Sequence, residues 1–297
     1  MSQMSQPVKS TPEVVLQDAI DMHCHFGPEP MLKKLTGAVH KVTPVQAATE
    51  ARELGMRALV LKAHEFPSVG IAHLVNDAVP EIKSFGGICC DFMVGGLNVG
   101  AVEVALDNGA KVVWLPTVSA ANDALLRPPE LMPPGDLYRV IDEDGNLIPD
   151  VLAIMDLVRE HDAVLATGHI SRDETFKVAE AFAGRGHLVT THAMSQTTGA
   201  RLTPQDCRDL ADAGVMIELT AHTCSGSPVQ FDLVVEAVKL VGAGGIVMST
   251  DYGWNIDLPS PGQGFLNYID QLWRVGVTED ELRQMTCINP ARTLGLD

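Results

Sequence analysis

The sequence predicts an α/β protein of the (β/α)8 class, a TIM barrel, with an insertion after its fourth strand. Eight short apolar runs that end in polar residues recur along the 297 residues, and segments with helical periodicity separate most of them. Near-continuous apolar strands that alternate with helices are typical of a parallel sheet whose outer face is covered. No Gly-x-Gly-x-x-Gly pattern follows the first run, which favours a barrel over an open nucleotide-binding sheet.

The eight strands are expected within one domain that spans residues 1–297. Length alone would also permit two smaller domains, so the strand count carries this prediction. The predicted strands are residues 19–25, 57–63, 87–94, 111–117, 163–169, 187–192, 215–220 and 245–251.

Helix-start signals lie between these runs. Thr43 is followed by Pro44 and Gln46, which together supply an N-cap hydroxyl, an N1 proline and a capping box. Similar starts, which predict the helices after strands 5, 6 and 8, lie at Ser171, Thr203 and Thr278. Two further helices are predicted over residues 97–108 and 228–242.

The alternation of strands and helices breaks between residues 118 and 150. Prolines at positions 128, 129, 133 and 134 predict a rigid loop, and residues 138–148 predict a hairpin that turns at Asp144-Gly145. We interpret residues 118–150 as an insertion in the barrel, beside its functional site.

The composition describes an ordinary globular protein with a strongly acidic charge balance. Hydrophobic residues make up 46% of the chain and charged residues 20%, and the net charge is −17. A field of this sign repels the phosphates of nucleic acids and anionic membrane surfaces. We therefore expect a small-molecule substrate, and neither nucleic acid nor a membrane as a partner.

The cysteines and the first residues indicate a cytoplasmic protein. The six cysteines include no Cys-x-x-Cys pair, so neither a thiolate zinc site nor a disulfide framework is expected. Residues 1–10 lack the basic and apolar regions of a signal peptide, and no run approaches 18 apolar residues.

The first strand ends in two histidines that project from the same face. His23 and His25 are separated by one residue, and side chains two apart on a strand point the same way. Two convergent imidazoles are suitable ligands for zinc and similar first-row ions, and a carboxylate such as Asp21 could orient one ring.

Polar residues also close the other predicted strands. In a (β/α)8 barrel the carboxyl ends of all strands meet at one face, where the chemistry takes place. We therefore expect the first two histidines to converge with the later strand ends and to form a metal site. The later strand-end residues are Lys62, His64, His169, His192, Glu218 and Asp251.

This arrangement resembles the amidohydrolase superfamily over most of the chain. The shared features are Asp21-x-His23-x-His25, single histidines on strands 5 and 6, an aspartate on strand 8, and a final segment, Asn289-Pro290-Ala291-Arg292-Thr293-Leu294-Gly295-Leu296, similar to an NPAxxLGL tail. The resemblance implies that His23, His25 and Asp251 bind a buried metal. It also implies that His169 and His192 bind a second metal or orient substrate and water, and that Asp251 accepts a proton from metal-bound water. The predicted catalytic residues are Asp251 and His192.

The sequence departs from the superfamily pattern on strand 4. Binuclear members usually carry a bridging carboxylated lysine or a glutamate there, whereas this strand offers Trp114 and Thr117, which cannot bridge two cations. Lys62 on strand 2 is a candidate replacement, because burial favours the neutral amine that captures carbon dioxide. The alternative is a buried lysine paired with Asp91 or Glu218.

The cofactor is expected to be one or two divalent ions. Zinc is the first choice, and iron, manganese or nickel would suit the same ligands. Further residues near the strand ends are candidate substrate contacts: His64, Arg172, Glu218, His222 and Trp254. Each also has a structural interpretation, such as surface placement for Arg172 and an ion pair with Lys62 for Glu218.

The predicted function is hydrolysis of an amide, a lactone or another ester bond of a small molecule by metal-activated water. Barrels that resemble this one also include metal-dependent decarboxylases and hydratases, so that class remains open. A third hypothesis is a non-catalytic barrel that binds a metal or another ligand. A homo-oligomer is expected, because such assemblies are common among soluble enzymes.

Overall fold

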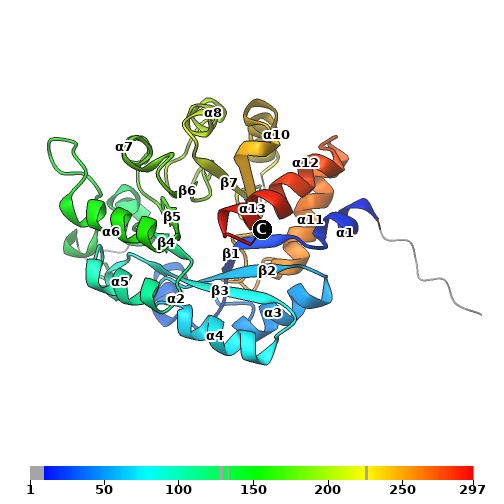
Figure 1. Cartoon of the computed structure of the whole chain (residues 1–297), viewed down its shortest axis with the longest axis horizontal. Coiled ribbons are helices and arrows are strands. Elements are labelled where there is room, and N and C mark those ends of the chain that lie inside the picture. The colour runs from blue at the N-terminus through cyan, green and yellow to red at the C-terminus, as the bar shows by residue number, and fades with distance from the viewer. Residues whose placement is uncertain (1–9, 127–129, 133, 225–226, 297) are drawn as a thin grey trace, which may run out of the picture.

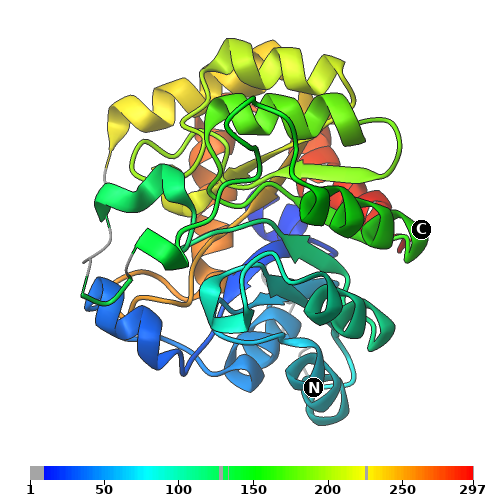
Figure 2. The same ribbon diagram turned by 90° about the vertical axis from the view of Figure 1, so that its left-hand side faces the viewer.

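The structure is a computed structural model that describes residues 10–126, 130–132, 134–224 and 227–296. Eight parallel strands pair in sequential order from β1 to β8, and helices surround them (Figure 1 and Figure 2). The strands are β1 (Ile20–His25), β2 (Ala58–Lys62), β3 (Lys83–Cys89), β4 (Val112–Trp114), β5 (Val164–Ala166), β6 (His187–Thr190), β7 (Met216–Thr220) and β8 (Ile246–Ser249). The prediction of a (β/α)8 barrel is confirmed.

Helices follow every strand. The α-helices are α1 (Thr11–Leu16), α2 (Pro30–Thr36), α3 (Pro44–Glu53), α4 (Val69–Ala78), α5 (Val99–Asp107), α6 (Pro149–Glu160), α7 (Arg172–Phe182), α8 (Pro204–Asp212), α9 (Ala221–Cys224), α10 (Pro228–Val241), α11 (Pro261–Arg274), α12 (Glu279–Arg283) and α13 (Asn289–Thr293). The predicted capping boxes at Thr43, Ser171 and Thr278 are present, as is the predicted N-cap at Thr203 with its N1 proline. In the part of the chain that the structure describes, no helix is long and apolar enough to cross a membrane.

Two predictions about the elements were wrong. The third strand begins at Lys83, four residues before the expected start, and residues 92–94 form a short 3-10 helix. Gly86 and Gly87 lie inside this strand. Glycine is required at these two positions because a Cβ would clash with the backbones of Val69 and Val112, respectively. The helix after strand 8 is α11, which begins well before the expected start at Thr278.

The segment between β4 and α6 contains two 3-10 helices, η2 (Ala121–Leu126) and η3 (Pro134–Asp136). An isolated antiparallel bridge joins Ile141 to Leu147, which is the pairing of the predicted hairpin. Pro128, Pro129 and Pro133 of the predicted rigid loop lie outside the described residues.

The barrel closes between β1 and the residues that follow β8. The His25 amide donates to the Tyr252 carbonyl at 2.8 Å, and the Asp251 amide donates to the His23 carbonyl at 2.8 Å. The Asp21 carboxylate joins the same two segments, since it accepts hydrogen bonds from the amide and hydroxyl of Thr250. Asp21 therefore contacts backbone and hydroxyl groups, and not the imidazole that it was expected to orient.

The carboxyl-terminal segment covers the opposite end of the barrel, where the strands begin. Ala291 and Leu294 pack against strand residues such as Ile20 and Val164 inside the barrel. The amide of Asn289 donates to the carbonyls of Ala243 and Ile246 at 2.7 and 2.6 Å. The NPAxxLGL-like tail thus has a structural role at the face away from the site.

We expect Asn289→Ala to lower the free energy of unfolding by about 1–3 kcal/mol, because the buried Ile246 carbonyl and the part-buried Ala243 carbonyl would each lose a donor. Urea denaturation followed by circular dichroism measures the change. Asn267→Ala is the matched control, because Asn267 lies on an exposed helix surface and its loss should change stability by less than about 0.5 kcal/mol. Equal effects of the two substitutions would contradict the role of Asn289.

Candidate metal centre and cavity

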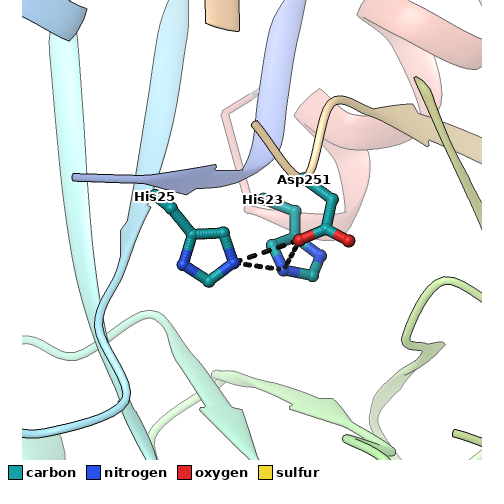
Figure 3. A group of neighbouring side chains, drawn as sticks. All are labelled: His23, His25 and Asp251. Carbon is teal, nitrogen blue, oxygen red and sulfur yellow. Dashed lines mark hydrogen bonds and ion pairs between the residues drawn. The ribbon is translucent and has the colours of Figure 1, made fainter. Parts of the chain in front are cut away.

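Three ligand atoms converge where β1 meets the end of β8 (Figure 3). His23 Nε2 lies 3.2 Å from His25 Nε2, and Asp251 Oδ1 lies 3.1 Å from each of these nitrogens. Ligands about 2.0–2.2 Å from a tetrahedral zinc ion lie roughly 3.3–3.6 Å apart. The three side chains would therefore need to move by only a few tenths of an ångström to hold one first-row ion.

The backbone is strained at two of the predicted ligands. Asp251 has a φ of 56° and His192 a φ of 29°, in the left-handed region that non-glycine residues rarely adopt. Such conformations cost about 1–3 kcal/mol each and persist where the surroundings determine them, often at functional sites. The hydrogen bond from the Asp251 amide to the His23 carbonyl is one such determinant.

Glu218 holds two of the site histidines from behind. Its Oε2 lies 3.1 Å from His23 Nδ1 and accepts a hydrogen bond of 2.7 Å from the His192 amide. A carboxylate behind an imidazole is a common way to orient a metal ligand. Glu218 was expected to contact substrate, but it is buried and does not line the cavity described below.

The protonation states at neutral pH suit metal binding. Burial lowers the pKa of His25 and that of His192 well below 6.5, so both rings are neutral. Burial raises the pKa of Asp251, but His23, His222 and His25 outweigh it and hold that pKa well below 3.8. Burial and Lys62 oppose the charging of His23, and Asp251 and Glu218 still raise its pKa to about 9. A cation at this position would replace that proton.

A second pair of histidines faces the same space from β5 and β6. His169 Nε2 lies 2.9 Å from His192 Nε2, and the rings of His192 and His23 stack at a centroid distance of 6.0 Å. His169 Nδ1 lies 3.1 Å from an oxygen of Asp123. The ring therefore has a carboxylate on one side and the second histidine on the other.

Lys62 is buried between the two groups of histidines and the end of β4. Its Nζ lies 2.9 Å from His23 Nε2 and 5.4 Å from the centre of the Trp114 ring. Among the described residues, no carboxylate lies within 4.0 Å of this nitrogen. The alternative of an ion pair with Asp91 or Glu218 is therefore wrong in this structure, because both carboxylates bind other groups.

A cavity of about 180 Å³ opens above these groups at the carboxyl ends of the strands. Its walls are apolar at Leu32, Val118 and Trp254 and carry the hydroxyls of Thr197 and Thr198. Most of the predicted site residues line it, namely His25, Lys62, His64, His169, His192, His222, Asp251 and Trp254.

His64 and His222 approach the metal site from opposite sides. His64 stacks on His25 at a centroid distance of 5.1 Å, and its Nδ1 lies 2.8 Å from the Thr117 hydroxyl. His222 Nδ1 lies 3.4 Å from Asp251 Oδ2, and its ring meets Trp254 edge to face. Both are therefore placed to contact a substrate.

Arg172 does not lie at the cavity. It is the first residue of α7, its side chain is 52% exposed, and its guanidinium pairs with Asp206 at 2.6 Å. The capping box at Ser171 sets the direction of the helix start, and the arginine stacks on Phe176 outside the barrel mouth. The prediction of Arg172 as a substrate contact is not supported by its position.

Asp91 is the centre of a buried hydrogen-bond network beside His64. One oxygen accepts the amides of Thr117 and Ser119 at 2.9 Å, and the other accepts the Thr117 hydroxyl and faces His64 Nδ1. Burial raises the pKa of this carboxyl, but His64, Thr117 and Ser119 bring it down to about 2. Asp91, His64 and Cys89 are also close enough to surround an ion, yet these hydrogen bonds already account for their arrangement.

Asp123 is the main site residue that the sequence did not reveal. It lies in η2 of the insertion, far in sequence from any strand end, and no motif marks it. Only the prediction that residues 118–150 lie beside the site gave a general signal. The wall residues Val118, Thr197 and Thr198 were missed for the same reason, since loops carry them, and Leu32 was missed in the short helix α2.

The (β/α)8 barrel has the same fold as several solved structures. The chain resembles a probable dipeptidase, PvdM, of Pseudomonas aeruginosa (11% identity, 96% of each chain, TM-score 0.66). It also resembles an amidohydrolase of Burkholderia multivorans with bound zinc (13% identity, 94% and 99% of the two chains, TM-score 0.58) and a 2,6-dihydroxybenzoate decarboxylase of Rhizobium (13%, 95% and 99%, TM-score 0.54). At these identities the similarity establishes the fold alone.

The chain itself belongs to a family of unknown function, DUF6282, whose model matches residues 18–218. The matched part includes β1 through most of β7 and therefore all four site histidines. No curated protein matches the chain.

We expect Asp91→Asn to lower the free energy of unfolding at neutral pH by about 2 kcal/mol, the equivalent of a pKa held near 2 instead of 3.8. A depressed carboxyl pKa stabilises the fold above the unfolded value and loses this effect as pH falls toward 2. The difference between wild type and variant should therefore shrink between about pH 4 and pH 2. Denaturation curves across that range test this, and a constant difference would contradict it.

Proposed function

We propose that this protein is a metal-dependent hydrolase that cleaves an amide, a lactone or another ester bond of a small molecule. The observation that carries the proposal is the triangle of His23, His25 and Asp251 at the floor of a cavity. Two imidazole donors, of which His23 would lose its proton when a cation binds, and one ionised carboxylate form a ligand set that zinc prefers, and iron, manganese or nickel would also accept it.

A divalent ion bound to this triangle supplies an acidified water and polarises the bond to be cleaved. The two oxygens of Asp251 have different surroundings. Oδ1 faces the ligand nitrogens, whereas Oδ2 lies on the side of His222. An ionised Oδ2 is suited to accept a proton from water, so Asp251 has the role of general base. His192 faces the same space and would orient the reacting groups or bind a second ion.

The cavity walls support a small substrate with an apolar part. Trp254, Leu32 and Val118 offer apolar surface, while His64 presents the edge of its ring that Thr117 and Asp91 do not occupy. We assign His64, His222 and Trp254 as substrate contacts. The cytoplasmic location and the homo-oligomeric state also remain predictions.

The number of metal ions that the site can bind depends on Lys62. We propose that the Lys62 amine, when unprotonated, adds to carbon dioxide and releases one proton to form a carbamate. Its oxygens would serve as ligands shared between an ion held by His23, His25 and Asp251 and a second ion held by His169 and His192. The position of Nζ beside His23 Nε2, without a carboxylate partner among the described residues, supports this. The buried Trp114 ring at the end of β4 occupies the usual place of the bridging residue.

Decarboxylation is the second candidate, because a decarboxylase is among the solved structures that share this fold. A panel of lactones, esters, amides and aromatic carboxylic acids, incubated with the zinc-loaded protein in oxygen-18 water, separates the two reactions. Hydrolysis places the label in the product, whereas decarboxylation releases carbon dioxide. A protein that binds zinc and converts no member of such a panel would favour the non-catalytic barrel.

Asp251→Asn is expected to reduce turnover by about 10²–10⁴-fold while the fold is retained, because the base is lost. Turnover, zinc content by mass spectrometry and circular dichroism are measured together. Asp206→Asn is the matched control, since Asp206 pairs with Arg172 outside the cavity. Wild-type turnover in Asp251→Asn would reject Asp251 as the base.

Lys62→Arg is expected to bind one zinc ion per chain where the wild type binds two, because arginine keeps the charge but cannot form the carbamate. Carbon-13 NMR in labelled bicarbonate should show a carbamate resonance in the wild type and none in the variant. Two bound ions together with an unmodified Lys62 in the wild type would overturn the bridge.

A further inference from the structure

We propose that Asp123 is a positioning residue that sets the ring tautomer of His169 and so places the lone pair that would bind the second ion on Nε2. The proposal rests on the metal site of the proposed function and adds a residue from the insertion to it. The ring nitrogen that faces Asp123 is Nδ1, at 3.1 Å from Oδ2.

The surroundings of Asp123 make its carboxylate a pure acceptor in a fixed orientation. Oδ2 also accepts a hydrogen bond from the Gly199 amide at 3.1 Å, and Oδ1 accepts one from Arg201 Nη2 at 2.9 Å. The Arg201 guanidinium forms an ion pair with this carboxylate, so the oxygens of Asp123 act as hydrogen-bond acceptors. An ionised oxygen repels a lone pair and attracts an N–H.

The electrostatics therefore place the proton of neutral His169 on Nδ1. A neutral imidazole carries one proton, so its lone pair then lies on Nε2, the nitrogen 2.9 Å from His192 Nε2. A carboxylate behind a ligating histidine fixes the tautomer and raises the basicity of the other nitrogen, and its loss typically weakens metal binding 10–100-fold.

Asp123 also fixes where the ring lies, because it connects the loops after three strands. The neighbouring Asn122 donates to the carbonyls of His169 and Gly199 at 3.1 and 2.7 Å. Arg201, which follows β6, binds both the Asp123 carboxylate and the Gly199 carbonyl. The insertion after β4 thus holds the histidine of β5 against the loop that follows β6.

Asp123→Asn is the sharpest test, because it preserves the shape of the side chain and replaces one accepting oxygen with a donating NH₂ group. Arg201 attracts the amide oxygen to the Oδ1 position, which turns the amide NH₂ toward His169 Nδ1. A donor at that position requires Nδ1 to be the acceptor and moves the proton to Nε2, where it blocks metal binding. Calorimetric titration of metal-free protein with zinc chloride should then show the first ion bound as in wild type and the second weakened 10–100-fold.

Two measurements complete the test. Asp206→Asn, a substitution in an ion pair outside the cavity, should leave both zinc affinities unchanged. Nitrogen-15 NMR of the metal-free wild type should show the His169 proton on Nδ1, and this result does not depend on whether Asp123→Asn folds. A proton on Nε2 in the wild type would overturn the proposal, as would unchanged affinity for the second ion in Asp123→Asn.

The outcomes also separate this proposal from the proposed function. A wild type that binds no zinc contradicts the metal-dependent hydrolase itself. A wild type that binds one ion, with no perturbation of the His169 ring signals, overturns the role of Asp123 and leaves a mononuclear hydrolase intact. A wild type that binds two ions supports the hydrolase, and Asp123→Asn then decides the role of Asp123 alone.

Discussion

The candidate metal centre depends on the hydrogen bonds that close the barrel between β1 and the residues after β8. The Asp251 amide binds the His23 carbonyl and the His25 amide binds the Tyr252 carbonyl, so closure places the aspartate beside both histidines. The left-handed φ of Asp251 costs free energy. Without the hydrogen bonds of closure, the backbone at this residue would relax to a more favourable conformation. Closure of the sheet and assembly of the ligand triangle are therefore one structural event, and a slip of one residue between these segments would remove the site.

Carboxylates that sit behind imidazoles are the second constraint. Glu218 faces His23, Asp123 faces His169 and Asp91 faces His64. Each carboxylate is buried and accepts a hydrogen bond from at least one backbone amide. These hydrogen bonds fix the position of the carboxylate, which in turn orients the imidazole ring. A buried anion with several donors is stable only while all of them are present. The rings that face the cavity thus obtain their orientation from β7, from the insertion and from the end of β3.

The sequence predicted the strand-end residues well because the rule behind them depends on the backbone alone. An alternating pattern fixes the face of His23 and His25, and parallel strands bring their carboxyl ends together, so His169, His192 and Asp251 follow. The same reasoning misplaced Arg172, because a residue that begins a helix obtains its direction from the cap and not from the strand. It could not find Asp123, since the path of an insertion depends on tertiary contacts that no periodicity encodes.

The charge balance around Lys62 argues for chemistry at this residue. The Lys62 side chain is buried beside His23, with no carboxylate within ion-pair distance among the described residues, so it lacks the partner that a positive charge there would require. The ring of Trp114 offers only a cation–π contact, worth about 2 kcal/mol when desolvated. Conversion of the amine to a carbamate would replace any positive charge with a negative one, which would attract cations held by the surrounding histidines. The proposed bridging ligand would thus come from the end of β2, whereas the end of β4 carries the Trp114 ring.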